Sequence, residues 1–232
     1  FVERQKMEVA KRYPRKEVQP VNRRSEVDDP LILREFSANS GGIPLDNHIA
    51  ISNDGKIVSV VNTNIGIYGQ NGVRFLTRTL FGFTRDANPK SNFQFDPRVM
   101  YDPIEDKFIM TFISGFECVN SEIIFAFSET NDPMGDWHLY VVDGCPDDNN
   151  IFADYPMMAL TETELIFTIN EVKENVSWQE GFEKTLIYQI DKASGFSGSD
   201  LKIRTWSDVS FEGKNIRNVC PIKAADEPTG NT

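Results

Sequence analysis

Short apolar runs, separated by clusters of Asp, Asn, Pro, Gly and Ser, follow one another along most of the chain. Runs that are dense in Ile, Val, Phe, Tyr and Met and bounded by turn residues predict β-strands joined by tight turns. The middle of the chain shows this pattern most clearly, and strands are expected at Arg98–Tyr101, Asp106–Ser114, Glu122–Ser128 and Trp137–Val142. Four antiparallel strands of this length are the size of one β-propeller blade.

The same pattern precedes and follows this central group. Upstream, strands are expected at His48–Ser52, Lys56–Asn62, Ile65–Tyr68 and Val73–Leu80. The turns that end at Gly55 and Gly72 favour hairpins there, because Asn and Gly accept a positive φ at low cost. Downstream, strands are expected at Pro156–Leu160, Glu164–Asn170, Lys184–Ile190 and Leu201–Trp206, with a long insert at Glu171–Phe182.

The three groups form an internal repeat. Each opens on an aspartate, Asp46, Asp96 or Asp154, three residues before an apolar strand residue, and the starts are 50 and 58 residues apart. A strongly apolar second strand comes next in every group. The stretch Asn218–Ile222 opens in a similar way and predicts the start of a fourth unit.

The predicted fold class is all-β, a β-propeller with blades at about 46–90, 96–145 and 154–208 and the next one starting at 218. Residues 1–45 are polar and interrupted by proline, which predicts an arm or linker with a short amphipathic helix at Phe1–Tyr13. Propellers use about four to eight blades, so this ring is incomplete. We expect the remaining blades to come from a longer polypeptide or from another chain. The first residue is Phe1 rather than Met, which favours a trimmed product without its targeting segment.

Charge narrows the possible partners. The 232 residues carry a net charge of −11, of which residues 1–26 contribute +4, so the body of the chain is strongly acidic. An acidic body argues against nucleic-acid binding, which needs a basic surface. It is compatible with cations, with neutral sugar or peptide ligands, or with a role in solubility alone. No run approaches the ~20 apolar residues of a membrane-spanning helix.

The second and third groups contain four further motifs: Asp96–Asp102 (DPRVMYD), Phe127–Trp137 (FSETNDPMGDW), Asp154–Pro156 (DYP) and Glu164–Asn170 (ELIFTIN). Through these motifs the chain resembles a family of secreted bacterial β-propeller proteins that is common among the Bacteroidota. Members often carry a sorting domain for type IX secretion, and no such domain is expected within these 232 residues. The resemblance implies export and surface exposure but no established activity.

The segment Ser128–Trp137 is also similar to the Asp-box turn of sialidase-like propellers, although its spacing is longer. That turn joins the third and fourth strands and sets a Trp into the core. Its role is structural, so the similarity transfers no sialidase activity. We therefore expect Trp137 to anchor the core rather than to bind a sugar.

The repeated aspartates are the main candidate site. The first residues of successive inner strands lie on one face of a propeller, so Asp46, Asp96 and Asp154 are expected to ring one mouth of the central channel. Acids, a base and an aromatic ring around a concave axis suit a sugar or cation site. Alternatively, each aspartate accepts hydrogen bonds only from its own turn. The candidate ligand-binding residues are Asp46, His48, Asp96, Arg98, Asp154 and Tyr155.

Two further sites follow from the loops. Cys118 and Cys145 are placed on the same face and are expected to form a disulfide, with two free thiols as the alternative; Cys220 is then unpaired. The acidic loop with Asp143, Asp147 and Asp148 suits calcium through its oxygen atoms, or is simply solvated. Calcium is the one cofactor that the sequence suggests.

The sequence therefore favours a secreted or surface-attached β-propeller that acts as a binding, adhesion or scaffold module for a protein or carbohydrate ligand. No nucleophile elbow, phosphate loop or zinc spacing is present, which leans against an enzyme. Two alternatives stay open. One is a glycoside hydrolase that uses two carboxylates about 5–10 Å apart. The other is one component of a larger extracellular assembly.

Overall fold

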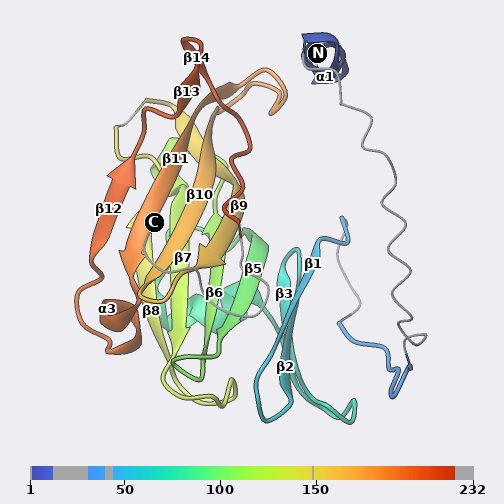
Figure 1. The fold of residues 1–232 in the computed structure, drawn as a ribbon. Coiled ribbons are helices and arrows are strands. Elements are labelled where there is room, and N and C mark those ends of the chain that lie inside the picture. Colours follow the sequence, from blue (N-terminus) through green and yellow to red (C-terminus); the bar gives the residue numbers. More distant parts are fainter. Residues whose placement is uncertain (1, 13–30, 40–43, 148, 223–232) are drawn as a thin grey trace.

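The structure, a computed structural model, describes residues 2–12, 31–39, 44–147 and 149–222, which fold mainly into antiparallel β-sheet (Figure 1). Three four-stranded sheets follow one another, each with its strands in sequence order. Sheet 1 contains β1 (Asn47–Ile51), β2 (Lys56–Val61), β3 (Asn64–Gly69) and β4 (Arg74–Thr79). Sheet 2 contains β5 (Gln94–Asp102), β6 (Lys107–Ser114), β7 (Glu122–Ser128) and β8 (Trp137–Asp143). Sheet 3 contains β9 (Ile151–Leu160), β10 (Glu164–Lys173), β11 (Phe182–Asp191) and β12 (Ile203–Trp206).

The predicted strands are all present, and the all-β prediction is confirmed. The largest errors are at two strand starts, since β5 begins before Pro97 and β9 before Pro156. Proline cannot donate to a strand ladder and normally marks a strand edge or a bulge. Here each strand continues through a register irregularity beside its proline, so the sequence placed the boundary too late.

Helices are short and lie outside the three sheets. The expected N-terminal helix is present as α1 (Val2–Arg12). Two others were not predicted, α2 (Leu80–Thr84) and α3 (Lys192–Phe196), because five residues are too few to show a helical period. A small hairpin of β13 (Ser210–Phe211) and β14 (Lys214–Asn215) follows sheet 3.

Sheet 2 lies between the other two sheets, which explains its long apolar runs. Every residue of β7 is buried, as expected for a strand that is covered on both faces. Alternate residues of β6 divide between two cores, because successive side chains point to opposite faces. Phe108 and Met110 belong to the core shared with sheet 1, whereas Ile109 and Ile113 belong to the core shared with sheet 3.

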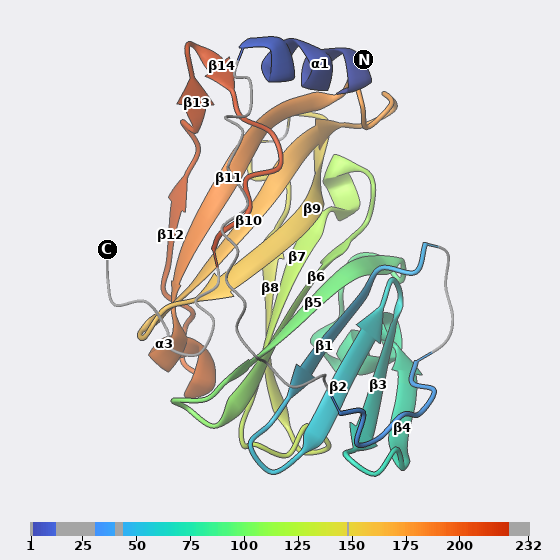
Figure 2. The same cartoon turned by 45° about the vertical axis from the view of Figure 1, so that its right-hand side comes forward.

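The first strands of the sheets lie side by side, with β5 between β1 and β9 (Figure 2). The described sheets form a fan and do not close into a ring. The outer face of sheet 1 carries residues 31–39, where the Phe36 ring lies 6.1 Å from that of Tyr68. On the outer face of sheet 3, Thr168 Oγ1 donates to the Val219 carbonyl at 2.6 Å. The stretch predicted to open a fourth unit therefore lies beside sheet 3, although its described residues form no strand.

The predicted disulfide between Cys118 and Cys145 is present, with the two Cα atoms 5.2 Å apart, and Cys220 is free and exposed. Trp137 is the predicted core anchor: its ring packs edge-on against Phe83 at 5.4 Å, and its Nε1 donates to the Pro133 carbonyl at 3.1 Å. Within the predicted arm of residues 1–45, residues 1, 13–30 and 40–43 lie outside the described residues.

Candidate functional site

Side chains at the start of each first strand tie that strand to the next. His48 Nδ1 lies 2.8 Å from the Val99 carbonyl oxygen and 3.3 Å from the Val99 amide nitrogen, which joins β1 to β5. Arg98 Nε donates to the Pro156 carbonyl at 3.0 Å, which joins β5 to β9. His48 and Arg98 occupy equivalent repeat positions, two residues after Asp46 and Asp96. These two side chains therefore have a structural role, because each connects two neighbouring sheets.

The backbone at these strand starts adopts an uncommon conformation. Asp96 has φ +54° and Tyr155 has φ +56°, both in the left-handed region, and each precedes a proline at a register irregularity. Such a conformation is costly for a residue with a side chain and is concentrated at functional sites. Asn218 repeats it with φ +58°. A left-handed residue thus lies at the start of the second and third groups, and another lies in the stretch expected to open the next unit.

The three aspartates, which we call the acid row (Asp46, Asp96 and Asp154), lie within electrostatic reach of one another. The pKa of Asp96 is raised to about 6, mainly by burial and then by the charges of Asp154 and Asp46, while Arg98 opposes the shift. No described residue donates a hydrogen bond to the Asp96 carboxylate. Asp96 is thus a half-buried acid that accepts no hydrogen bond from the described protein.

The other members of the row differ from Asp96. Burial raises the pKa of Asp154, but the Tyr155 backbone amide donates to its carboxylate and the Arg217 charge opposes the shift. Asp46 is exposed. Tyr155 is 39% exposed as a whole residue. The structural alternative, in which each aspartate caps its own turn, therefore applies to Asp154 and not to Asp96.

Arg217 is a member of this region that the sequence did not indicate. Its guanidinium donates to the carbonyls of Gln179 and Trp178 at 3.2 and 2.6 Å and stacks over the Trp178 ring at 5.2 Å. These contacts hold a positive charge near Asp154. Its position directly before Asn218, at the start of the expected fourth unit, is the one signal that would have located it.

The predicted calcium loop has other contacts. Asp143 accepts a hydrogen bond from the Cys145 amide at 3.0 Å, and Asp147 lies 3.6 Å from Lys184 Nζ. Asp148 lies outside the described residues. Within the described part of the chain, no group of three or more acidic, His or Cys side chains is arranged to hold a metal ion.

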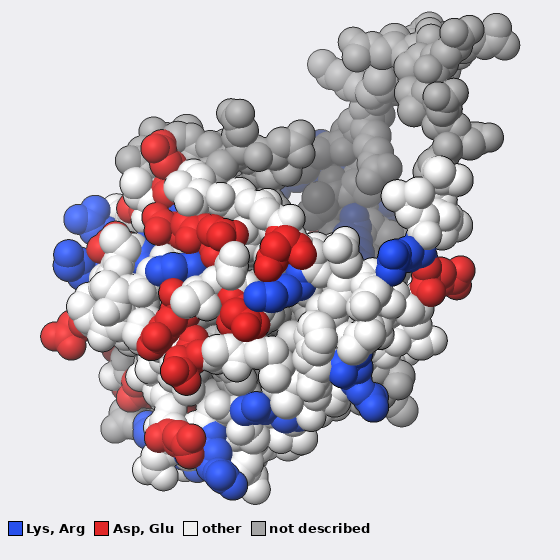
Figure 3. All heavy atoms as spheres, turned by 90° about the horizontal axis from the view of Figure 1, so that it is seen from below, with Lys and Arg blue, Asp and Glu red and all other residues white. Residues whose placement is uncertain are grey.

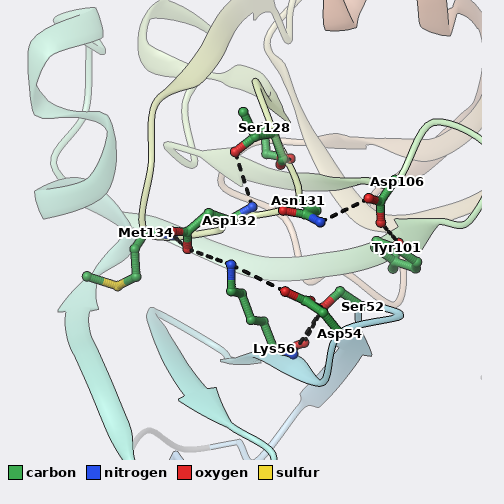
Figure 4. Close-up of polar contacts among 10 residues, drawn as sticks. Ser52, Asp54, Lys56, Tyr101, Asp106, Ser128, Asn131, Asp132 and Met134 are labelled. Carbon is green, nitrogen blue, oxygen red and sulfur yellow. Dashed lines mark hydrogen bonds and ion pairs between the residues drawn. The ribbon is translucent and has the colours of Figure 1, made fainter.

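The opposite ends of the same strands carry a different set of carboxylates, and Figure 3 views the molecule from that side. Asp54, Asp106 and Asp132 lie in the turns that follow β1, β5 and β7 (Figure 4). Each of them is engaged by protein donors. Asp54 is contacted by Ser52 and Lys56. Asp106 accepts hydrogen bonds from Tyr101 and Asn131. Asp132 is contacted by Lys56 and by the Met134 amide.

Chemically, the region combines an acid that is partly protonated near neutral pH, the neighbouring carboxyl groups of the acid row and the exposed Tyr155. Such a set can accept and donate hydrogen bonds to hydroxyl groups and stack against a sugar ring. No known protein family, curated protein or solved structure matches this chain. None of the described helices has the length and apolar character needed to cross a bilayer.

Proposed function

We propose that this chain forms consecutive blades of a β-propeller that acts as a secreted or surface-exposed binding module. Its ligand is a carbohydrate held at the acid row. The observation that carries the proposal is the Asp96 carboxylate, which is half-buried and accepts no hydrogen bond from any described residue. A buried acceptor without a donor costs free energy unless a ligand supplies one.

The propeller part of the proposal is supported by the repeat. Three four-stranded meanders lie face to face, and their first strands are linked in order by His48 and Arg98. The disulfide supports export, because disulfides persist in oxidising compartments.

Further blades are supported by the outer face of sheet 1. Ile49 is 56% exposed, whereas Val99, which occupies the equivalent repeat position in sheet 2, is fully buried against sheet 1. The same type of face is therefore an interface between sheets in one place, whereas in sheet 1 residues 31–39 contact part of it and Ile49 stays exposed. We propose that another blade, from a longer polypeptide or a second chain, covers Ile49. An intact mass of the natural protein distinguishes the two sources, since a mass near 26.4 kDa requires the second chain.

The ligand site is tested with a glycan array and with calorimetry on the glycans that bind. Asp96→Asn keeps the shape of the side chain but removes its charge, and we expect affinity to fall about tenfold. Asp136→Asn is the matched control, because Asp136 is an exposed aspartate at the opposite end of the strands. Equal affinities for wild type and Asp96→Asn, or an array without any bound glycan, would overturn the proposal.

A second candidate function, glycoside hydrolysis, is favoured by the pKa of about 6 at Asp96 beside the second carboxylate of Asp154. A general acid needs a pKa near the working pH, and a neighbouring ionised carboxylate is its usual companion. Release of reducing ends from bound glycans is the assay. Turnover that Asp96→Asn and Asp154→Asn both abolish supports an enzyme, whereas binding without turnover leaves the binding module.

A further inference from the structure

A pocket of about 350 Å³ opens between the outer strands of sheets 2 and 3, and no member of the acid row lines it. Its walls come from the end of β8 with the following loop, and from β10, β11 and the end of β12. The lining residues that matter for its chemistry are Asp143, Asp147, Glu171, Lys184, Leu186 and Tyr188.

Glu171 is the unusual group in this pocket. Its side chain is 1% exposed, and its buried Oε2 receives no hydrogen bond from the described residues. Lys184 Nζ lies 3.3 Å from Oε2 and is its ion-pair partner. Burial raises the pKa of Glu171, and Lys184 opposes that shift. A buried carboxylate is an acceptor only, and it gains strongly from any N–H donor that reaches it.

The single positive charge of Lys184 does not balance the negative charges of the carboxylates that line the pocket. Its Nζ also lies 3.6 Å from Asp147 Oδ2, so one ammonium group is shared by two carboxylates. Asp143 adds a third carboxylate to the lining. Burial, and then the charges of Glu171 and Asp143, raise the pKa of Tyr188, which keeps its hydroxyl protonated. The pocket therefore holds three carboxylates against one cation.

The disulfide fixes the loop that supplies the two aspartates. Cys145 is bonded to Cys118 and donates its amide to Asp143 Oδ1 at 3.0 Å, and Asp147 follows two residues later. The Cys118 amide in turn donates to Glu174 Oε2 at 3.3 Å, just beyond β10. The Cys118–Cys145 disulfide thus connects the loop after β8 to the end of β10, which form two walls of the pocket.

We infer that this pocket binds a small aliphatic cation that carries a guanidinium group, either as a free molecule or as an arginine side chain. The planar N–H donors pair with the buried carboxylate of Glu171 and with Asp147. Leu186 and Val142 offer an apolar wall to the methylene groups. An organic cation suits the site better than a metal ion, because the described residues contain no metal-binding group of three.

The test is calorimetry on the full chain with n-butylguanidinium and its neutral counterpart n-butylurea. We expect saturable binding of the cation and affinity weaker by at least about tenfold for the urea. N-acetylarginine methylamide identifies the source, since its binding admits a peptide side chain and its exclusion restricts the site to free small cations. Equal affinity for the charged and neutral probes, or no saturable binding of either, would overturn the inference.

Variants locate the binding within the protein. Glu171→Gln and Asp147→Asn should each weaken n-butylguanidinium, by about tenfold and about threefold. Glu183→Gln, on the same strand as Lys184 but ion-paired with Lys173 at 2.6 Å and outside the pocket lining, should leave affinity unchanged. Asp147 is 64% exposed, so its variant keeps the test decisive if Glu171→Gln fails to fold. If Glu171→Gln folds, unchanged affinity in both single variants would exclude this pocket as the binding site. If it does not fold, unchanged affinity in Asp147→Asn would exclude the pocket.

Discussion

The two ends of the inner strands use aspartate in opposite ways. At the turn end, Asp54 is held by Ser52 and Lys56, and these donors lower its pKa. At the start of the strands, Asp96 is half-buried and lies near two other carboxylates. Burial, and then these two charges, raise its pKa to about 6. Asp54 and Asp96 are both aspartates near one end of the first strand of a sheet. The difference is whether the protein itself supplies the donors.

This contrast separates structural carboxylates from candidate functional ones. A carboxylate that accepts hydrogen bonds from the protein contributes to stability and has less capacity left for a ligand, whereas one without such donors reduces stability and retains that capacity. Substitutions at the turn end should therefore destabilise the fold. Substitutions at the acid row should affect binding and leave stability equal or higher.

The largest loss of stability is expected from Asp102→Ala. Asp102 and Lys192 are both almost completely buried, with Lys192 Nζ 2.5 Å from Asp102 Oδ2, and they join sheet 2 to α3. Removing one partner leaves a buried charge and should cost about 3–5 kcal/mol, measured by urea unfolding. The double variant Asp102→Leu with Lys192→Met should recover part of this loss. A loss below about 1 kcal/mol in Asp102→Ala would contradict the structural role.

Removal of the disulfide should have the next largest effect. Cys118 and Cys145 are 27 residues apart, and replacing both with Ala should cost about 3 kcal/mol by the chain-entropy estimate. Cys220→Ala is the control, because Cys220 is free and exposed. Equal unfolding midpoints for the double variant and for wild type would show that the bond contributes nothing.

A moderate loss is expected from Asp106→Asn at the turn end. Asp106 has φ +54°, which Asn tolerates, so the substitution isolates the loss of the charge and of one of the two oxygens that accept from Tyr101 and Asn131. We expect a cost of about 1–2 kcal/mol. The Tyr101 pKa, raised to about 12 by burial and by its bond to Asp106, should also fall, which ultraviolet titration measures. An unchanged Tyr101 titration would refute the contact.

The smallest effect, with the opposite sign, is expected from Asp96→Asn. An acid whose folded-state pKa is raised binds its proton more tightly when folded, so stability falls as pH rises from about 4 to about 6. Asparagine does not ionise, so the variant should match wild type near pH 4. Above pH 6 it should exceed wild type by up to about 1 kcal/mol, after allowance for solvent screening. Urea unfolding across this range measures the difference, and a variant less stable than wild type at pH 7 would contradict it.

Sequence patterns were sufficient for the strands and insufficient for the contacts between sheets. Apolar runs such as that of β7 are local signals, and so is the Gly55 turn, where φ is +82°. The acid row was recognised because it repeats. Arg217 and the pair of Glu171 with Lys184 were missed, since their partners come from distant segments and no spacing encodes them. Whether an aspartate accepts hydrogen bonds from the protein likewise depends on its neighbours in the fold. The sequence alone therefore does not distinguish Asp54 from Asp96.

The binding role of Asp96 depends on a carboxylate that receives no hydrogen bond from the described residues. A carboxyl-carbon NMR titration of the free protein tests this, with Asp54 as an internal reference. We expect Asp96 to titrate at about 6 and Asp54 to titrate below 3.8. Titration of Asp96 at or below 3.8 would show that the protein already stabilises the ionised carboxylate and would remove the reason for a ligand there.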